Sequence, residues 1–400
     1  MNPISYLRKN GIKHALKVVY QYKIDKVIIA LLKPFLKNKP LQNIIIIESH
    51  NDFDCNGGAF YEYLIRNGYN KKYKIVLLLK HHELKPNDLP ENVVCVPLFK
   101  PNIMKDYYIC RAKIFTADNT VTDKVRDDQQ SYYFTHGAGG LKNVHGYINI
   151  NNTVDYVLMQ SENYAPIQAY QYSLHYPSKR LLFLGYPIHD VLNSESSLEL
   201  SKLTSRKYNK VILWMPTFRK AIGNRIDSNK EQALGIPLIN TQNELVKLNN
   251  ILKHKDSLLI IKIHPMQDVK GLKIKTMSNI LVLTNREVKG LNIDNYRLMA
   301  NTDALISDYS GAAYDYLQLN KPIGYVLEDM NDYKLGFVIQ DIKNLIAGHE
   351  IYNIMDLEKF IVDIIGGNDK FREKREMIKN YIYKYNDTNN CKRIVEFMGL

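Results

Sequence analysis

IIIIESHNDFDCNGGAFYEYLIR, residues 44–66, is the stretch from which we predict the fold. Ile44–Glu48 is a short apolar run without alternation, which is typical of a parallel strand buried on both faces. A polar loop with two glycines follows, and residues 59–66 then have a helical pattern. A strand that leads through a loop into a helix is the repeating unit of an α/β fold.

The same order repeats along the chain in two series. The first series of further predicted strands comprises Lys74–Leu79, Val93–Leu98, Ala112–Thr116, Tyr132–Thr135, Val154–Met159 and Leu181–Leu184. The second comprises Val211–Met215, Leu258–Ile263, Ile280–Leu283, Ala304–Ile306 and Ile323–Val326. A polar, serine-rich stretch separates the two series. This alternation predicts two α/β domains with doubly wound parallel sheets, over residues 41–195 and 206–370, followed by a helical tail over residues 371–400.

The length and composition agree with this prediction. A chain of 400 residues is long enough for two domains. Its 45% hydrophobic and 24% charged residues are typical of a folded soluble protein, and no apolar run approaches the roughly 20 residues that cross a bilayer. We therefore do not expect an integral membrane protein. The four cysteines lack CxxC spacing and indicate neither a zinc site nor disulfides, and without a signal sequence we expect a cytoplasmic protein.

Positive charge is concentrated at the N-terminus. The chain has 54 Lys and Arg against 41 Asp and Glu, a net charge of +13, which points to an anionic partner. Residues 1–40 hold nine basic residues and one acid, so +8 lies there. Lysines and apolar residues at helical spacing predict a pair of basic amphipathic helices, either packed on the body or lying on an anionic membrane surface. Their apolar stripe comprises Ile12, Leu16, Val19, Ile24, Ile28, Leu31 and Phe35.

The loops after the strands are the places to look for a site, because ligands bind beyond the carboxyl ends of the strands in open parallel sheets. After the first strand, Gly57 and Gly58 lie directly before the predicted helix and would let a substrate or phosphate approach backbone N–H groups at its start. Asp52 and Asp54 lie in the same loop, but two carboxylates without a third ligand indicate a solvated turn rather than a metal site.

A second loop, THGAGGLK at residues 135–142, follows another predicted strand. His136 has a side chain suited to accept a proton near neutral pH, and three glycines in the next four residues let the backbone fold tightly around a reacting group. We interpret His136 as catalytic. The alternative is a glycine-rich turn with a capping histidine.

The second half offers three comparable loops. In MPTFR, residues 215–219, Arg219 has a planar fork suited to phosphate oxygens and Thr217 adds a hydroxyl group. In LLIIKIHP, His264 ends a strand and is followed by a proline. Two histidines at strand exits of the two domains form a more specific pattern than either alone.

The third of these loops is ISDYSGAAYDYL, residues 306–317. Ser310 and Gly311 are small residues at a strand-to-helix junction, where free N–H groups and the helix dipole attract a pyrophosphate. Asp315 would reach ribose hydroxyl groups from this helix. Asp308 is assigned to the same site, with an N-cap role as the alternative.

In this order, these elements resemble the CDP-glycerol:poly(glycerophosphate) glycerophosphotransferase family of teichoic acid and capsule synthesis. The resemblance runs from about residue 44 to about residue 350. The matching elements are THGAGGLK (135–142), LGYPIHDVL (184–192), MPTFR (215–219), IHP (263–265) and, strongest, ISDYSGAAYDYLQLNKP (306–322).

The resemblance implies a GT-B architecture, in which two Rossmann-like domains face each other across a cleft and a C-terminal helix crosses back. It implies transfer of glycerol or ribitol phosphate from CDP-glycerol or CDP-ribitol to a hydroxyl group of a lipid-linked, polyprenyl diphosphate saccharide, with release of CMP. The two central histidines of the family fall on His136 and His264. Arg219, Ser310 and Gly311 fall among the contacts to the donor phosphates. The residues assigned to the donor are Thr217, Arg219, Asp308, Ser310, Gly311 and Asp315, and those assigned to the acceptor side are Gly57, Gly58, Gly137 and Lys142.

From these parts we predict a mechanism. His136 takes the proton of the attacking hydroxyl, while His264, Arg219 and Ser310 hold the diphosphate, without a required cofactor or protein-bound metal.

The chain departs from the family pattern at three places, and these leave the identity of the alditol open. Ile188 and His189 replace the usual Arg and Asn, Gly311 replaces a Ser, and residues 347–349 replace a PGP element.

The resemblance also favours the membrane interpretation of residues 1–40, at the cytoplasmic face, because a lipid-linked acceptor is presented there. Three alternatives remain open: a nucleotide-sugar glycosyltransferase with the same architecture, a nucleic-acid-binding module, and a non-enzymatic assembly subunit. Of these, nucleic acid is not expected as a partner because no recognition motif accompanies the charge.

Overall fold

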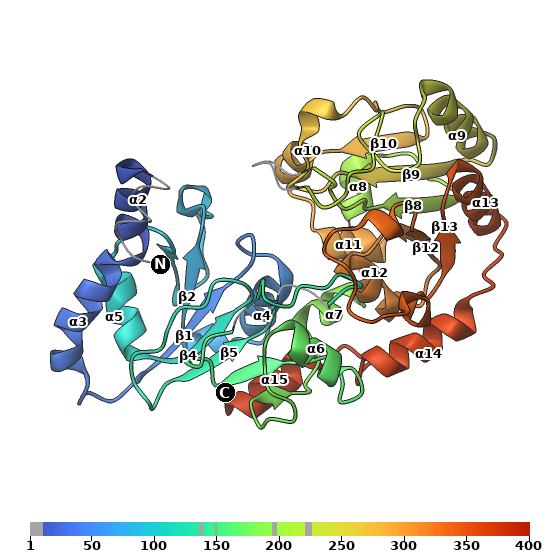
Figure 1. Ribbon diagram of the computed structural model, residues 1–400. Helices are drawn as coiled ribbons and strands as arrows, with labels where there is room; N and C mark the ends of the chain where they lie inside the picture. The colour runs from blue at the N-terminus through green and yellow to red at the C-terminus, as the bar shows by residue number, and fades with distance from the viewer. Residues whose placement is uncertain (1–10, 136–138, 149, 194–197, 221–225) are drawn as a thin grey trace.

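Two parallel β-sheets form the frame of the molecule (Figure 1). The computed structural model describes residues 11–135, 139–148, 150–193, 198–220 and 226–400. The N-terminal sheet has seven strands in the order β3-β2-β1-β4-β5-β6-β7. Its strands are β1 (Gln42–Glu48), β2 (Lys74–Leu79), β3 (Val93–Pro97), β4 (Ala112–Ala117), β5 (Gln130–Tyr133), β6 (Tyr156–Leu158) and β7 (Leu181–Leu182).

The C-terminal sheet has six strands in the order β10-β9-β8-β11-β12-β13. Its strands are β8 (Lys210–Trp214), β9 (Ser257–Lys262), β10 (Ile280–Leu283), β11 (Ala304–Ser307), β12 (Ile323–Val326) and β13 (His349–Ile351). All predicted strands are confirmed within a few residues, and every pairing between these strands is parallel. Only β13 was not predicted, because its three residues, His349, Glu350 and Ile351, include just one apolar side chain.

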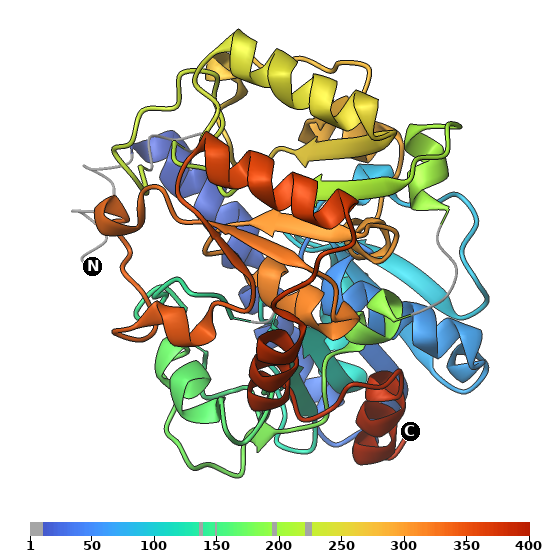
Figure 2. The same ribbon diagram turned by 90° about the vertical axis from the view of Figure 1, so that its right-hand side faces the viewer.

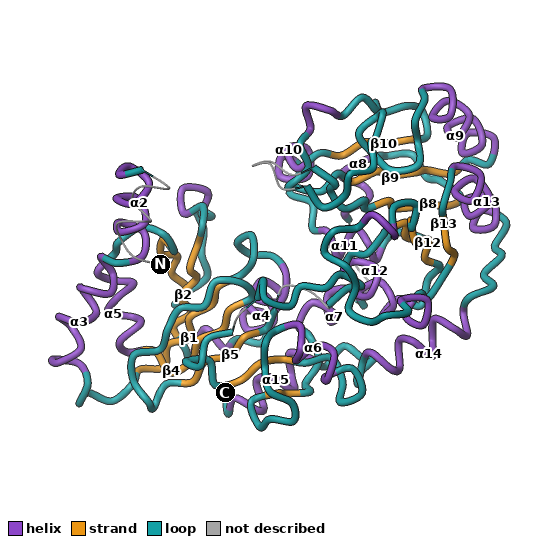
Figure 3. The backbone as a smooth tube through the Cα atoms, in the orientation of Figure 1, coloured by secondary structure: helices purple, strands orange, loops and turns teal. Residues whose placement is uncertain are grey.

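Helices cover both faces of each sheet, and strand β1 shows why its sequence is apolar without alternation (Figure 3). Ile45 and Ile47 pack in one cluster with Phe60 of helix α4 (Cys55–Arg66). Ile44 and Ile46 pack in another cluster on the opposite face. The remaining helices of the two halves are α5 (Ile103–Arg111), α6 (Ala165–Gln171), α7 (Pro187–Leu192), α8 (Glu199–Leu203), α9 (Gln242–His254), α10 (Asn285–Gly290), α11 (Asn295–Ala300), α12 (Gly311–Tyr316) and α13 (Ile354–Ile365).

Each sheet reverses its strand order beside its first strand. From β1 the chain adds β2 and β3 on one side and then β4 to β7 on the other, and from β8 it does the same with β9 and β10 before β11. Such a reversal opens a crevice at the carboxyl ends of the two central strands. The loops after β1, β4, β8 and β11 are therefore positioned to form a site.

The N-terminal segment forms helices α2 (Ile12–Tyr22) and α3 (Ile24–Leu36). Helix α3 packs on α5, where Nζ of Lys105 lies 2.7 Å from Oδ2 of Asp25. Most of the predicted apolar stripe nevertheless faces solvent, and Phe35 is 77% exposed. The other exposed members of the stripe are Ile12, Leu16, Val19 and Leu31.

The C-terminal tail forms two helices rather than the single crossing helix of the sequence prediction. Helix α14 (Arg372–Ile382) packs Ile378 and Ile382 into the core of the C-terminal half. Helix α15 (Asn390–Met398) packs Ile394 and Val395 into the N-terminal core, and its Phe397 lies edge-on against Tyr132 of β5 and Tyr156 of β6. Figures 1 and 2 both show α15 against the N-terminal half, so the chain ends on the half where it began.

Candidate active site

A cavity of about 370 Å³ lies where loops of the two halves meet. Loops at the carboxyl ends of β1 and β5 contribute from the N-terminal half, and loops after β8, β9 and β11 contribute from the C-terminal half. Of the residues predicted from the sequence, Lys142, Thr217, His264, Ser310, Gly311 and Asp315 line this cavity. Gly57, Gly58, Arg219 and Asp308 do not. The predicted His136 and Gly137 lie outside the described residues.

The loop after β5 is bound directly to the C-terminal half. Lys142 forms an antiparallel bridge with Phe337, and the N–H group of Val338 donates to the carbonyl oxygen of Leu141 at 2.9 Å. Leu141 is fully buried in the C-terminal core. A Cβ atom on Gly140 would lie 2.7 Å from the carbonyl oxygen of Tyr309, so only glycine allows this approach. The loop over residues 139–142, predicted for the acceptor side, therefore lines the cavity and is attached to the C-terminal half.

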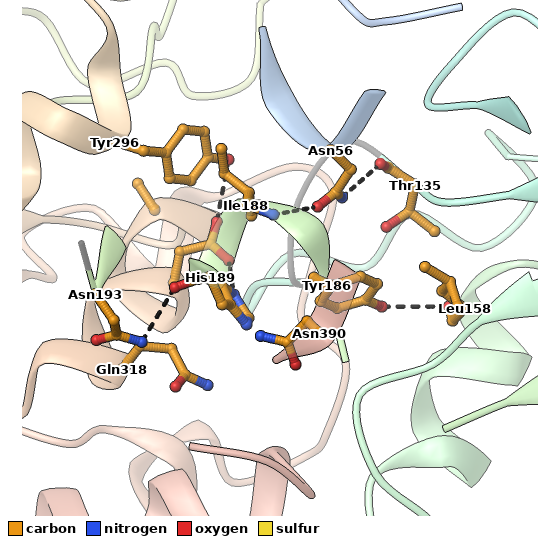
Figure 4. Close-up of polar contacts among 12 residues, drawn as sticks. Asn56, Thr135, Leu158, Tyr186, Ile188, His189, Asn193, Tyr296, Gln318 and Asn390 are labelled. Carbon is orange, nitrogen blue, oxygen red and sulfur yellow. Dashed lines mark hydrogen bonds and ion pairs between the residues drawn. The ribbon is translucent and has the colours of Figure 1, made fainter. Parts of the chain in front are cut away.

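Asn56 holds the start of that loop, a role that the sequence analysis missed. Its Nδ2 atom donates to the carbonyl oxygen of Thr135 at 2.9 Å, and its Oδ1 atom accepts from the N–H group of Ile188 at 3.0 Å (Figure 4). Thr135 lines the cavity and has a φ of 65°, a conformation that costs energy for a β-branched residue. The residue directly before His136 is thus anchored at the cavity.

His264 lies just after β9 and lines the cavity from the C-terminal half. Its Nδ1 atom accepts from the N–H group of Met266 at 3.1 Å, and its ring packs against Phe218 with 4.9 Å between centroids. Because Nδ1 accepts this bond, the neutral imidazole carries its proton on Nε2. The geometry suits Nε2–H as a hydrogen-bond donor.

Arg219, predicted to bind phosphate, is instead held by carboxylates beneath the cavity. Its Nε atom donates to Asp329 at 2.6 Å and its Nη1 atom donates to Asp308 at 2.8 Å. Burial by itself would lower the pKa of Arg219, but Asp308 and Asp329 overcome this effect and raise it. The side chain is 2% exposed and outside the cavity lining, and its charge is paired with these two carboxylates.

The structure also places Asp308 differently from both predictions, because it lies outside the cavity lining and is not an N-cap. Its carboxylate accepts from the N–H group and hydroxyl group of Thr217 and from Arg219, so it caps no helix. Burial favours its neutral form, but Arg219, with Lys142 and Thr217, lowers the pKa of Asp308 below its usual value. The N-cap of α12 is Ser310, whose Oγ atom accepts from the N–H group of Ala312 at 3.3 Å. Ser310 and Gly311 remain at the cavity wall.

Asp315, predicted to reach ribose hydroxyl groups, has polar partners at both carboxylate oxygens. Its Oδ1 atom lies 3.0 Å from Nε2 of His189, and its Oδ2 atom accepts from the hydroxyl group of Tyr296 at 3.3 Å. His189 also packs edge-on against Tyr383, with 4.9 Å between ring centroids.

The motif GYPIHD, residues 185–190, fastens the tail to this junction. The Asp190 carboxylate accepts from the N–H groups of Asn390 and Cys391 at 3.0 and 2.8 Å and so caps the start of α15. A Cβ atom on Gly185, where φ is +81°, would lie within 1.8 Å of the Asn390 side chain. The motif therefore joins the N-terminal half, α12 and α15.

The glycines after β1 serve packing rather than ligand approach. The N–H group of Gly57 donates to Asp118 at 2.8 Å, and a Cβ atom on Gly58 would lie 2.3 Å from the carbonyl oxygen of Phe53. Nearby, Asp52 accepts from the N–H groups of Lys80 and His81, and Asp54 accepts from Asn51. These contacts match the prediction of a turn.

In the described part of the chain, no three His, Cys, Asp or Glu residues are grouped as metal ligands would be.

Two cavity residues were not singled out from the sequence. His50 follows β1, and burial, together with the charge of Lys80, lowers its pKa to about 4, so its imidazole is neutral near pH 7. Lys262 is the last residue of β9 and is 5% exposed. Burial lowers the pKa of Lys262 to about 8, although the charge of Asp54 acts in the opposite direction. Both residues lie at the ends of predicted strands, and this position in the sequence is the signal by which they could have been found.

Comparisons with known proteins agree with this fold. The sequence profile of the CDP-glycerol:poly(glycerophosphate) glycerophosphotransferase family matches residues 29–399. A teichoic acid glycerol-phosphate primase of Bacillus subtilis (strain 168) is 25% identical over 387 residues, which cover 90% of this chain and 92% of the relative. A teichoic acid poly(glycerol phosphate) polymerase of Bacillus spizizenii (strain ATCC 23059 / NRRL B-14472 / W23) is 24% identical over 323 residues, or 73% of this chain and 76% of the relative.

The solved structure of the wall teichoic acid polymerase TagF superposes on this chain with a TM-score of 0.73. The two are 17% identical, and the match covers 100% of this chain and 98% of the other. Both share the arrangement of two parallel sheets with helices, so the predicted α/β fold of GT-B type is confirmed.

Proposed function

Because the chain belongs to the CDP-glycerol:poly(glycerophosphate) glycerophosphotransferase family, we propose that it transfers an alditol phosphate from CDP-glycerol or CDP-ribitol to a hydroxyl group of a lipid-linked saccharide acceptor. One observation carries the proposal. The loops of three family motifs, which contain Thr135, His264 and Ser310, are far apart in the sequence and meet at one cavity between the two sheets. The product would be part of a teichoic acid or capsular polymer.

The proposed reaction is an in-line displacement at phosphorus. The acceptor oxygen attacks the phosphorus that bears the alditol and forms a new P–O bond. The bond from that phosphorus to the oxygen bridging towards the cytidine-bearing phosphate breaks, and CMP leaves with the electron pair. The acceptor proton passes to His136, which follows the cavity residue Thr135 in the sequence. His264, with its proton on Nε2, donates to the donor diphosphate.

The test is release of CMP across a donor panel of CDP-glycerol, CDP-ribitol and UDP-sugars, with a synthetic polyprenyl diphosphate-linked saccharide as acceptor. We expect CMP only from a CDP-alditol, and mass spectrometry of the product gives the number of units added. Release of UDP from a UDP-sugar instead would establish a glycosyltransferase, and no release from any donor would favour a non-enzymatic subunit.

His136→Ala and His264→Ala are the matching variants. Each is expected to lower turnover by about 100-fold or more, because each removes a proton acceptor or donor from the transition state. His175→Ala is the control, since His175 is exposed and outside the cavity lining. Near-normal turnover of His136→Ala would refute its role as the base.

We also propose that α2 and α3 attach the protein peripherally to the cytoplasmic face of the membrane. Their apolar side chains are exposed, with Ile12 at 69%, Leu31 at 67% and Phe35 at 77%, and the intervening Lys13 and Lys17 are exposed as well. An exposed apolar stripe among lysines fits an anionic lipid surface, to which each lysine adds about 1 kcal/mol. Among the described helices, none has the length and apolarity to span a bilayer.

Sedimentation with vesicles of phosphatidylglycerol or phosphatidylcholine tests this attachment. The wild-type protein is expected to sediment with the anionic vesicles, and Leu31→Ser/Phe35→Ser to remain in the supernatant. Met355→Ser removes an apolar side chain that is 70% exposed on another helix and serves as control. Deletion of residues 1–40 without any change in sedimentation would refute the attachment.

A further inference from the structure

The positive charges that line the cavity are few. Among the described residues of the lining, Lys142 and Lys262 are the only lysines and there is no arginine. Arg219 lies outside the lining and is engaged by two carboxylates. Ile188, in the motif that follows β7, is apolar and buried. The counter-charge for a diphosphate bound in this cavity must therefore come from one of these two lysines.

Lys262 is the lysine best placed to supply this charge. Its side chain is 5% exposed and lines the cavity, and it makes no hydrogen bond or ion pair with any described residue. Lys142, in contrast, contributes to the electrostatic field at Asp308. A buried ammonium group without a partner is costly unless a ligand supplies the missing charge.

We propose that Lys262 binds the diphosphate of the nucleotide donor and holds positive charge beside the phosphoryl group that is transferred. This inference rests on the proposed function and adds a ligand-binding residue to it. Lys262 is two residues before His264, and side chains two apart in an extended segment point to the same side. A lysine and a histidine N–H group at one strand exit then meet the same anion, the lysine as a point charge and the histidine as a directed donor.

The ionisation of Lys262 gives the proposal a measurable pH dependence. Its pKa of about 8 leaves the ammonium form dominant at pH 7 and removes it at higher pH. Among the described residues, the charged group that acts on Lys262 is Asp54, which lies across the cavity in the loop after β1. Its negative charge raises the pKa of Lys262. On its own strand exit the neighbouring titratable group is His264. The diphosphate of a CDP-alditol is esterified on both phosphates and does not ionise near pH 8, so a loss of kcat/KM in this range reports the enzyme.

Lys262→Met and Lys262→Arg test the proposal, with Lys210→Met as the control. Lys210 starts β8 at the opposite end of the sheet and pairs with Asp303 outside the cavity. We expect Lys262→Met to lower kcat/KM for the donor by about 100-fold and to weaken binding of CDP, measured by calorimetry, by at least about tenfold. Binding of cytidine, which has no phosphate, should not change, and this also reports intact folding.

The pH profile separates a charge contact from a structural role. In the wild type, kcat/KM should fall through about pH 8, and in Lys262→Arg this fall should move to higher pH because guanidinium stays protonated. Asp54→Asn should shift it to lower pH, since an anion that favours the ammonium form is lost. A rate that rises through pH 8 would identify Lys262 as a base and overturn the proposal.

The two proposals can fail separately. Normal turnover and normal CDP affinity in Lys262→Met would overturn the inference and leave the proposed function intact. A wild-type protein that releases no CMP, yet binds CDP through Lys262, would contradict the proposed function and support the inference. Equal loss of CDP and cytidine binding in Lys262→Met would show that the substitution disturbs the fold around the cavity rather than a phosphate contact, and would also count against the inference.

Discussion

Nε2 of His189 lies 3.0 Å from Oδ1 of Asp315, and the two side chains are both 2% exposed. The pair joins α7, which follows the N-terminal sheet, to α12, which begins at the cavity. The pair is therefore a specific buried contact between the two halves.

Removal of His189 should destabilise the protein. In His189→Ala, the buried Asp315 carboxylate keeps Tyr296 but loses its partner at Oδ1, which costs about 1–3 kcal/mol. Urea unfolding of His189→Ala, Asp315→Ala and the double variant forms a double-mutant cycle, and we expect a coupling of about 1 kcal/mol or more. Strictly additive losses would mean that the contact contributes nothing, and His175→Ala should leave stability unchanged.

Arg219 is expected to act on stability. Arg219→Met leaves Asp308 and Asp329 buried without their cation, at a cost of about 3–5 kcal/mol. A residue that only bound phosphate would instead raise the KM for the donor in a protein of normal stability. Thermal unfolding together with donor KM distinguishes these outcomes.

This loss also has a defined pH dependence. The folded-state pKa of Asp308 is below its ordinary value of 3.8, so the stabilisation is present above pH 3.8 and is lost as the pH falls through the lower folded-state value. The difference in stability between the wild type and Arg219→Met should therefore shrink in acid. A difference that stays constant down to about pH 2 would contradict the assignment.

Gly140 and Gly139 form a matched pair in the loop that meets the C-terminal half. A Cβ atom on Gly140 would lie 2.7 Å from the carbonyl oxygen of Tyr309 and 2.9 Å from the backbone nitrogen of Gly311, whereas one on Gly139 would lie 3.7 Å from the Tyr164 hydroxyl. We expect Gly140→Ala to push the loop off α12 and to lower CMP release by about tenfold or more, because misplacement by an ångström is costly in catalysis. Gly139→Ala should retain activity, and equal effects would argue against the close approach.

The junction between α3 and the body should weaken as pH rises. Asp106 is fully buried, and burial, with the nearby Asp25, raises its pKa to about 7. A raised folded-state pKa gives stability that is complete below the unfolded value and is lost as the pH rises through about 7. Asp106→Asn should remove this loss and be more stable than the wild type at pH 8 by on the order of 1 kcal/mol. Urea unfolding at pH 5 and pH 8 measures this, and parallel pH dependence in both proteins would refute it.

Much of the frame could be predicted from the sequence. Runs such as Ile44–Ile47 and Leu258–Ile261 lie between helices on both faces of a sheet, and an apolar run without alternation carries that information locally. The motif loops around Ser310 and His264 were predicted at strand exits for the same reason. The sequence predicted parallel, doubly wound sheets but not the order of the strands within them, so the reversal beside β1 and β8 comes from the folded structure.

The sequence by itself determined the strands, their parallel direction and the strand-exit loops of the site, because the hydrophobic pattern that marks them is local. The tertiary structure alone decided what the charged residues do there. Arg219 is paired with Asp329, 110 residues away, and the Asp315 carboxylate contacts His189, 126 residues away. Lys262 is left without such a partner among the described residues. Whether a charge is compensated depends on distant side chains and on burial, so its role follows only from the folded arrangement.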